Sequence, residues 1–115
     1  MLAKTNRLKP DWAVTKVRRR GKRVKTGLFH LFYLSRKRGQ SVRFAFVVPL
    51  RVSKKAVLRN KLRRRAREAV KPIIAELKPG TDVLISFSPR SLPKSVKDLQ
   101  DAFLKTFIKS HLLRK

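Results

Sequence analysis

The residues best suited to chemistry in this sequence are arginines that recur at a fixed spacing near its middle. Arg59, Arg63 and Arg67 are four residues apart, so on a helix they form one row along its surface. A second row runs beside it, formed by Asn60, Arg64 and Lys71. A guanidinium group donates two parallel hydrogen bonds to two phosphate oxygens, and an amide both donates and accepts. The rows therefore predict a surface that binds phosphate, with an amide suited to a 2′-hydroxyl or a base edge.

This stretch is too one-sided in charge to be an ordinary solvated helix face. From residue 59 to residue 71 there are seven Lys or Arg and a single acid, Glu68. Like charges at i and i+4 destabilise an isolated helix, and a merely solvated face alternates in sign. An apolar stripe about 120° wide anchors the same helix: Leu58, Leu62, Ala66, Ala69, Val70 and Ile73. We therefore expect a polyanion to bind residues of this helix and basic residues that flank it: Arg59, Asn60, Lys61, Arg63, Arg64 and Arg67, with Arg51, Lys54 and Lys55.

The whole chain has the same imbalance of charge. Its 115 residues include 32 Lys and Arg against six Asp and Glu, a formal net charge of +26. A compact domain with that charge repels itself, and nucleic acid is the favoured partner because phosphate neutralisation releases counterions. An anionic membrane surface is the alternative, but the cations here are spread along the chain rather than gathered in one cluster. Cysteine is absent, and no run approaches the roughly 20 apolar residues of a membrane-spanning helix, so we expect a cytoplasmic protein.

The sequence offers little to a protein-based catalyst. The six acids are scattered, without a pair at an acid–base spacing, and the two histidines, His30 and His111, are far apart. The glycines match no nucleotide-binding loop. We expect His30 to lie either on the cleft face of its strand or simply in solvent. We therefore predict no catalytic residue and no metal site in the protein itself, and a role that is electrostatic and positional.

Hydrophobic periodicity predicts six elements in the order α-β-β-α-β-α. They are a helix from Pro10-Asp11 to about Arg20, strands at 28–34 and 42–48, a helix at 56–71 that stops or kinks near Pro72, a strand at 82–87 and a helix at about 95–112. The link at 35–41 is typical of a hairpin. This order predicts an α+β sandwich with helices packed on a small sheet. We expect one domain over residues 1–115, with residues 1–9 as a loosely held basic arm.

The first predicted strand is apolar on both of its faces. Phe29, Leu31 and Tyr33 point one way, and His30 and Phe32 point the other way with their apolar neighbours. One face can enter the core. The other is an unusually aromatic surface unless another element or a ligand covers it.

The arginine-rich stretch resembles the signature helix of the bacterial ribonuclease P protein family. That helix has the pattern Arg-Asn-x-x-(Lys/Arg)-Arg-x-x-Arg, and residues 56–68 here read Ala-Val-Leu-Arg-Asn-Lys-Leu-Arg-Arg-Arg-Ala-Arg-Glu. The pattern falls on Arg59, Asn60, Arg63, Arg64 and Arg67. The resemblance extends over nearly the whole chain and includes Asn6-Arg7-Leu8, Gly21-Lys22, Phe29 with Leu31, and Pro79-Gly80-Thr81-Asp82.

The resemblance implies a fold, a set of partners and a reaction. The family's fold is an α–β sandwich in which the signature helix lies in a left-handed βαβ crossover. Its members assist a catalytic RNA that removes the 5′ leader of precursor tRNA by magnesium-dependent hydrolysis. By resemblance, the partners are that RNA and precursor tRNA, and Mg²⁺ is bound mainly by the RNA subunit and the substrate. Neither DNA nor a membrane is an expected partner.

The resemblance also implies a cleft for the leader between the sheet and the first helix. Phe29, Leu31 or Phe32 would form its floor, since unpaired bases stack on aromatic side chains. By resemblance, Val14 and Arg18 of the first helix also line this cleft, although they align with two positions that are commonly aromatic in the family, so the chain departs from the family there. Many family members have Val-Ser-Lys-Lys shortly before the signature helix. The same letters stand here at residues 52–55, but an alignment without gaps places residues 48–51 at that segment, and we prefer this alignment. A basic role is kept for both stretches.

Two other classes of protein share some of these features. A ribosomal protein has a similar charge and differs by lacking the Arg59-Asn60 pattern and the aromatic strand. A DNA-binding regulator could use residues 56–71 as a recognition helix, but it needs a helix and a short turn just upstream, where strand-like residues stand.

Overall fold

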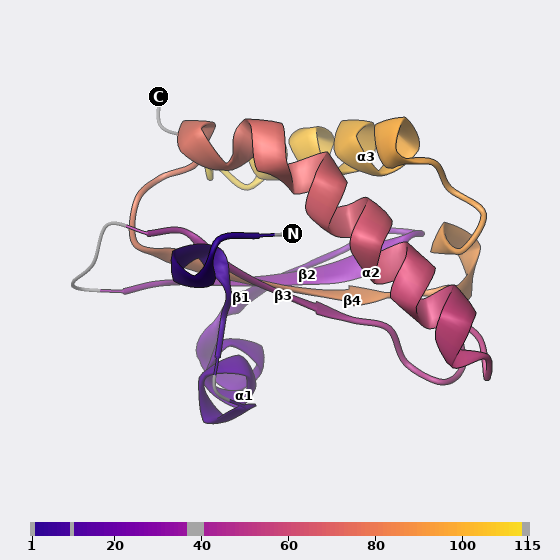
Figure 1. Cartoon of the computed structure of the whole chain (residues 1–115). Coiled ribbons are helices and arrows are strands. Elements are labelled where there is room, and N and C mark those ends of the chain that lie inside the picture. The colour runs from indigo at the N-terminus through magenta and orange to yellow at the C-terminus, as the bar shows by residue number, and fades with distance from the viewer. Residues whose placement is uncertain (1, 10, 37–40, 114–115) are drawn as a thin grey trace.

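The computed structural model describes residues 2–9, 11–36 and 41–113. In these residues four strands form one sheet in the order β1-β2-β4-β3. The strands are β1 (Lys22–Lys25), β2 (Phe29–Ser35), β3 (Arg43–Val47) and β4 (Thr81–Phe87). One helix, α1 (Asp11–Arg20), covers one face of the sheet, while α2 (Ala56–Val70) and α3 (Val96–Lys109) cover the other (Figure 1). The predicted α+β sandwich is confirmed, and none of the described helices has the length and apolar content needed to cross a membrane.

The strand pairing corrects the expected hairpin. β4 lies between β2 and β3, so the link at 35–41, of which residues 37–40 lie outside the described part, joins strands that are not neighbours. The hairpin is formed instead by β1 and β2, with Lys22 opposite Tyr33. β1 was not predicted because it is a mostly exposed edge strand, Lys-Arg-Val-Lys, with no apolar alternation to reveal it.

α2 lies in a βαβ unit, because the strands before and after it, β3 and β4, pair in parallel. This agrees with the crossover that the resemblance implied, whose handedness stays a prediction. The helix ends at Val70, and a 3₁₀ helix, η2 (Lys71–Glu76), follows with Pro72 in its first turn. The expected stop near Pro72 is confirmed, since a proline lacks the N–H that a continuing helix needs.

The larger core lies between the sheet and the pair α2 and α3. Phe29 and Leu31 of β2 enter it and are 0% exposed. The ring of Phe29 lies 5.2 Å from that of Phe103 on α3. The helices contribute the stripe residues Leu62, Ala66, Ala69, Val70, Leu99, Phe103 and Phe107. This continuous apolar contact therefore fixes the orientation of α2 on the sheet.

A second, smaller core lies on the opposite face, under α1. It consists of Leu8, Ala13, Val17 and Leu84. The buried side chains of α1 are small, and Trp12, at the start of the helix, is 68% exposed. Partly buried residues border this core, namely Val14, Phe32, Leu34, Ala45 and Val47. This face of the sheet is thus covered only in part.

The structure contradicts the expectation that residues 1–9 are a loose arm, for the described residues 2–9. The Leu8 N–H donates to the Phe44 carbonyl at 2.8 Å, and Asn6 Nδ2 donates to the Val42 carbonyl at 2.8 Å. Leu2 is buried in the larger core and Leu8 in the smaller one. Two leucines amid basic residues are a weak sequence signal, but each anchors the segment by removing apolar surface from water. The segment lies along the β3 edge of the sheet.

Candidate nucleic-acid interface

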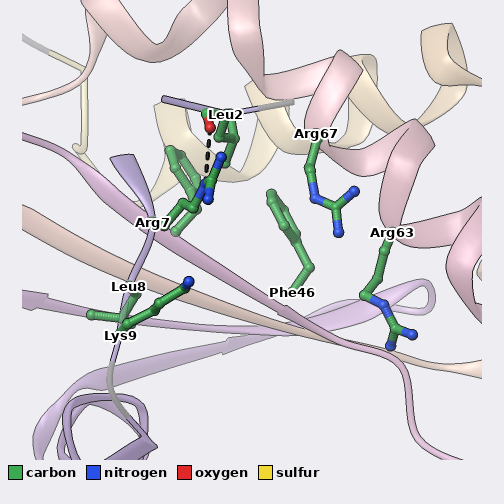
Figure 2. Close-up of a pocket in the computed structure, with 8 residues that line it drawn as sticks. Leu2, Arg7, Leu8, Lys9, Phe46, Arg63 and Arg67 are labelled. Atoms are coloured by element: carbon green, nitrogen blue, oxygen red, sulfur yellow. Dashed lines mark hydrogen bonds between the residues drawn. The ribbon is translucent and has the colours of Figure 1, made fainter. Parts of the chain in front are cut away.

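The predicted binding residues of α2 divide between two directions. Asn60, Lys61 and Arg64 are exposed on the outer side of the helix. Arg59, Arg63 and Arg67 are half-buried, and the last two extend toward the sheet (Figure 2). The division follows from the buried stripe, because a residue next to the stripe is held close to the sheet and one opposite to it is not. The row of three arginines predicted from the sequence is present.

A groove of about 300 Å³ separates α2 from the N-terminal segment. Arg63 and Arg67 stand on its α2 side, and Arg7 and Lys9 stand on its other side (Figure 2). Its remaining lining residues are Leu2, Leu8, Phe44 and Phe46. The sequence analysis did not select Arg7 or Lys9 as binding residues. The signal that could have found them was Asn6-Arg7-Leu8, already noted as similar to the family's opening.

Among the described residues that line this groove there are four cations and no acid. Burial lowers the pKa of Arg63 from its ordinary value, and the neighbouring charges of Arg59 and Arg67 lower it further. Arg63 donates to the Asn60 side-chain oxygen, and Arg59 Nη1 donates to the Ser53 carbonyl at 2.9 Å. Arginine stays protonated in proteins in spite of such shifts. The mutual repulsion is relieved when an anion binds.

The single acid of α2 lies away from this groove. Glu68 is exposed, and its carboxylate accepts from Lys71 Nζ at 3.3 Å. Lys71, which the sequence placed in the second row, lies in η2 and is engaged by this pair. Lys54 and Lys55 are exposed just before the helix, where the Lys55 N–H donates to Ser53 Oγ at 3.1 Å. The flanking lysines therefore extend the positive surface beyond the first turn of α2.

A second groove, of about 420 Å³, lies on the α1 face of the sheet. Arg18 of α1 and Arg51, which follows β3, line it together with Phe32 of β2. The rest of its lining is His30, Val47, Pro49 and Ser86. Val14 packs in the small core beside Phe32. Of the residues expected at a leader cleft, Arg18 and Phe32 thus meet in one groove, with Val14 next to it and Arg51 on its border.

The expectation that Phe29 or Leu31 floors this cleft is wrong. Both are fully buried on the other face of β2, beneath the helix pair. Side chains alternate along a strand, so residues 29 and 31 cannot share a face with residues 30 and 32. The sequence showed two apolar faces, and only the packing of α3 on one of them decides which is open.

His30 is a residue of this groove that the binding-site prediction left out. It pairs across the sheet with Ser86 of β4, which also lines the groove. Burial lowers the pKa of His30 below its ordinary value, and the charges of Lys25, Arg23 and Arg51 lower it further. The imidazole is therefore neutral at neutral pH, with one donor and one acceptor nitrogen. The sequence offered the cleft face of the strand as one of two places for His30, because His30 alternates with Phe32, and the structure places both residues in this groove.

The fold and the two grooves define a class: a small, strongly basic α+β protein with a βαβ unit and a cationic groove on each side of its sheet. A model of the family described as "Ribonuclease P" matches residues 2–111. The chain belongs to this family of ribonuclease P protein components. It is 31% identical to the ribonuclease P protein component of Synechocystis sp. over 114 residues, which cover 96% of this chain and 92% of that one.

Other relatives agree in sequence and in fold. The chain is 35% identical to the ribonuclease P protein component of Bacillus velezensis over 111 residues, 91% of this chain and 92% of that one. Its fold matches the RNase P protein of Staphylococcus aureus with a TM-score of 0.84 at 18% identity, covering 95% of this chain and 98% of that one. The RNase P protein of Thermotoga maritima matches with a TM-score of 0.76 at 19% identity, covering 87% and 93%.

Proposed function

We propose that α2 and the groove beside it bind the catalytic RNA subunit of ribonuclease P. The observation that carries this proposal is the row Arg59, Arg63 and Arg67, which is fixed on a buried stripe and repelled by its own neighbours in the free protein. Each guanidinium that meets a phosphate replaces this repulsion by a charge-assisted hydrogen bond. The exposed Asn60 beside the row supplies an amide for a 2′-hydroxyl or a base edge.

The groove on the α1 face binds the 5′ leader of precursor tRNA. Its open aromatic ring, Phe32, suits an unpaired base, and Arg18 and Arg51 lie where they can meet the flanking phosphates. The two grooves lie on opposite faces of one sheet, so the protein can hold the catalytic RNA and the leader at the same time. This open aromatic groove favours the ribonuclease P role over that of a purely structural ribosomal protein.

The chemistry of leader removal belongs to the RNA in this proposal. Among the described residues, no three of His, Asp and Glu lie close enough together to hold a metal ion. The buried Asp82 accepts from both Arg36 and Arg43, the latter at 2.7 Å, so its charge is already balanced. In this proposal Mg²⁺ is held by the RNA and the substrate, whose phosphates are ligands that Mg²⁺ prefers. The protein's part is to neutralise phosphates and to position the leader.

Reconstitution with the cognate catalytic RNA tests this function. At low magnesium and moderate salt, added protein should accelerate cleavage of a precursor tRNA well above the rate with RNA alone. Arg63→Ala should lose much of this gain, whereas Lys97→Ala, which removes an equal charge from the exposed start of α3, should keep it. Cleavage that is no faster with protein than without it would overturn the assignment. Co-sedimentation with ribosomal subunits at high salt would instead support the ribosomal alternative.

A further inference from the structure

The groove between α2 and the N-terminal segment has features that a simple basic surface does not need. Its volume of about 300 Å³ is at the low end for small-ligand pockets, enough for one nucleotide but not for a double helix. Cations stand on both of its sides, Arg63 and Arg67 facing Arg7 and Lys9 (Figure 2). No acidic residue is among its lining residues. An anionic, narrow ligand fits this space.

An aromatic ring lies between the two basic walls. Phe46 of β3 is only partly buried, and Figure 2 shows it between the α2 arginines and the N-terminal segment. Its ring stacks on that of Phe44, with centroids 5.7 Å apart and planes 7° from parallel. The ring also stacks on Phe87 at 6.4 Å. Phe46 is thus braced by two neighbouring rings, and its partial exposure leaves ring surface on which a nucleobase can stack.

The side of the groove opposite α2 is the N-terminal segment, and hydrogen bonds hold this segment in place. Arg7 Nε donates to the Leu2 carbonyl at 2.9 Å, which orients its guanidinium along the wall (Figure 2). The Leu8 N–H donates to the Phe44 carbonyl, so Lys9 follows directly from a strand-like attachment. An adjoining hollow of about 380 Å³ shares Arg7 and Lys9 and adds Lys4. Arg43 also borders that hollow, and its guanidinium is paired with Asp82.

We propose that this slot takes one unpaired nucleotide of the RNA that α2 binds, with its base on Phe46 and its phosphates between the two basic walls. Paired RNA has no free base face to offer, whereas an unpaired nucleotide stacks on an aromatic ring and is tracked by cations along its backbone. The RNA strand then continues past Lys9 toward Lys4 through the adjoining hollow. The proposal rests on the proposed function of α2, and it adds a contact that the arginine row alone does not predict.

Affinity for the cognate catalytic RNA tests the stacking and the second wall separately. Phe46→Leu should weaken binding roughly 5- to 150-fold, the range of one lost stacked base. Phe46→Tyr keeps a ring of the same shape and should bind like the unchanged chain. Lys9→Ala should lower the slope of log affinity against log salt by about 0.7, the value for one phosphate of a single strand. Lys97→Ala is the matched control for the lost charge. It should bind the RNA as tightly as the unchanged chain, and its melting temperature should be the same.

A fluorescent reporter makes the result independent of other binding surfaces. Trp12 is the only tryptophan of the chain, so Phe46→Trp combined with Trp12→Phe places the sole tryptophan in the slot. A short oligouridylate should quench its fluorescence by stacking, and a fully paired, blunt-ended RNA duplex should not. Bound oligouridylate without quenching would show that charged side chains merely cover the ring, and would overturn the slot.

The failure of the slot and the failure of the proposed function give different results. If Arg63→Ala weakens binding while Phe46→Leu and Lys9→Ala behave like Lys97→Ala, only the slot is wrong. If Arg63→Ala also behaves like the control, then α2 does not bind the RNA and the proposed function is wrong with it. A Phe46→Leu chain that melts early is judged by the tryptophan reporter instead.

Discussion

The two grooves lie on opposite faces of the same sheet, yet they are built in opposite ways. The groove beside α2 has cations on both sides, two on a helix that packs in the larger core and two on the N-terminal segment. The groove beside α1 has a broader floor from three strands and a short helix held by small side chains, Ala13 and Val17. The first is a charged slot in which Phe46 is the more exposed of two rings, and the second is a partly apolar floor bordered by two arginines.

This difference predicts two kinds of RNA contact. Binding beside α2 should depend steeply on salt, because its free energy comes mainly from released counterions. Binding on the α1 face should depend less on salt, because stacking on Phe32 and contacts to His30 and Ser86 add to the two arginines. If RNA binding at the two grooves had the same salt dependence and the same loss of affinity when the aromatic ring is removed, this contrast between the grooves would be wrong.

The largest expected effect is a loss of folding stability, and it should differ between substitutions on the two faces of β2. Phe29→Ala removes a fully buried ring that contacts Phe103 and Phe87, and it should lower the free energy of unfolding by about 3–5 kcal/mol. Phe32→Ala removes a partly exposed ring and should cost clearly less. Chemical denaturation of both variants, followed by circular dichroism, measures the difference. Equal losses would mean that the two faces of β2 are equally buried.

The same pair of residues shows how far the sequence leads. Periodicity placed all three α-helices and three of the strands, because each has enough apolar periodicity to mark its core-facing side. It could not tell which aromatic face of β2 is open, since residues 29–34 carry apolar groups on both faces. That choice depends on where α3 packs, a contact between distant segments.

The sequence predicted the basic residues of α2 in the candidate site, but not the basic residues of the N-terminal segment that face them. Arg59, Arg63 and Arg67 share one helix, so their spacing alone aligns them. Arg7 and Lys9 face them only because Leu2 and Leu8 anchor the N-terminal segment on either side of the β3 edge. No local pattern specifies that attachment. The family pattern at Asn6-Arg7-Leu8 pointed to the segment, and the geometry supplies the reason.

The next effect in size is electrostatic. Arg67→Ala should weaken binding of the catalytic RNA by about 1.5–3 kcal/mol, the range for a hydrogen bond to a charged group. It should also reduce the salt slope by about 0.7–0.9, as one phosphate contact is lost. Filter binding between low and moderate salt measures both quantities. Arg65→Ala is an informative contrast, because Arg65 Nη1 donates to the Leu92 and Lys94 carbonyls and its loss should lower stability more than the salt slope.

A stacking effect of similar or smaller size is expected in the other groove. Phe32→Ala should weaken binding of precursor tRNA with a long leader by about 1–3 kcal/mol, and leave binding of leaderless tRNA nearly unchanged. The salt slope should stay the same, because no charge is removed. Competition between the two tRNA species on the reconstituted holoenzyme gives the ratio directly. Equal losses for both species would argue against a leader site on this face.

The smallest expected effect is a dependence of leader binding on pH through His30. In the free protein the pKa of His30 is below its ordinary value, first because of burial and then because of Lys25, Arg23 and Arg51. Arg18 lines the same groove from α1 and adds to this positive surrounding. Leader phosphates bring negative charge, so they should raise this pKa in the complex. The bound state then takes up a proton, and leader affinity should rise as pH falls below about 7, until both states are protonated.

The free protein should respond to pH in the opposite direction. A histidine whose pKa is lowered by folding binds fewer protons in the native state than in the unfolded one, so stability is retained above about 6.5 and declines as pH falls through the native pKa. His30→Gln should flatten both responses, whereas His111→Gln, an exposed position in the turn after α3 and outside this groove, should leave them in place. Leader affinity and thermal midpoint measured from pH 5.5 to 8 give the two curves. Curves of the same sign would mean that His30 senses only the fold, and that the leader's phosphates do not reach the groove it lines.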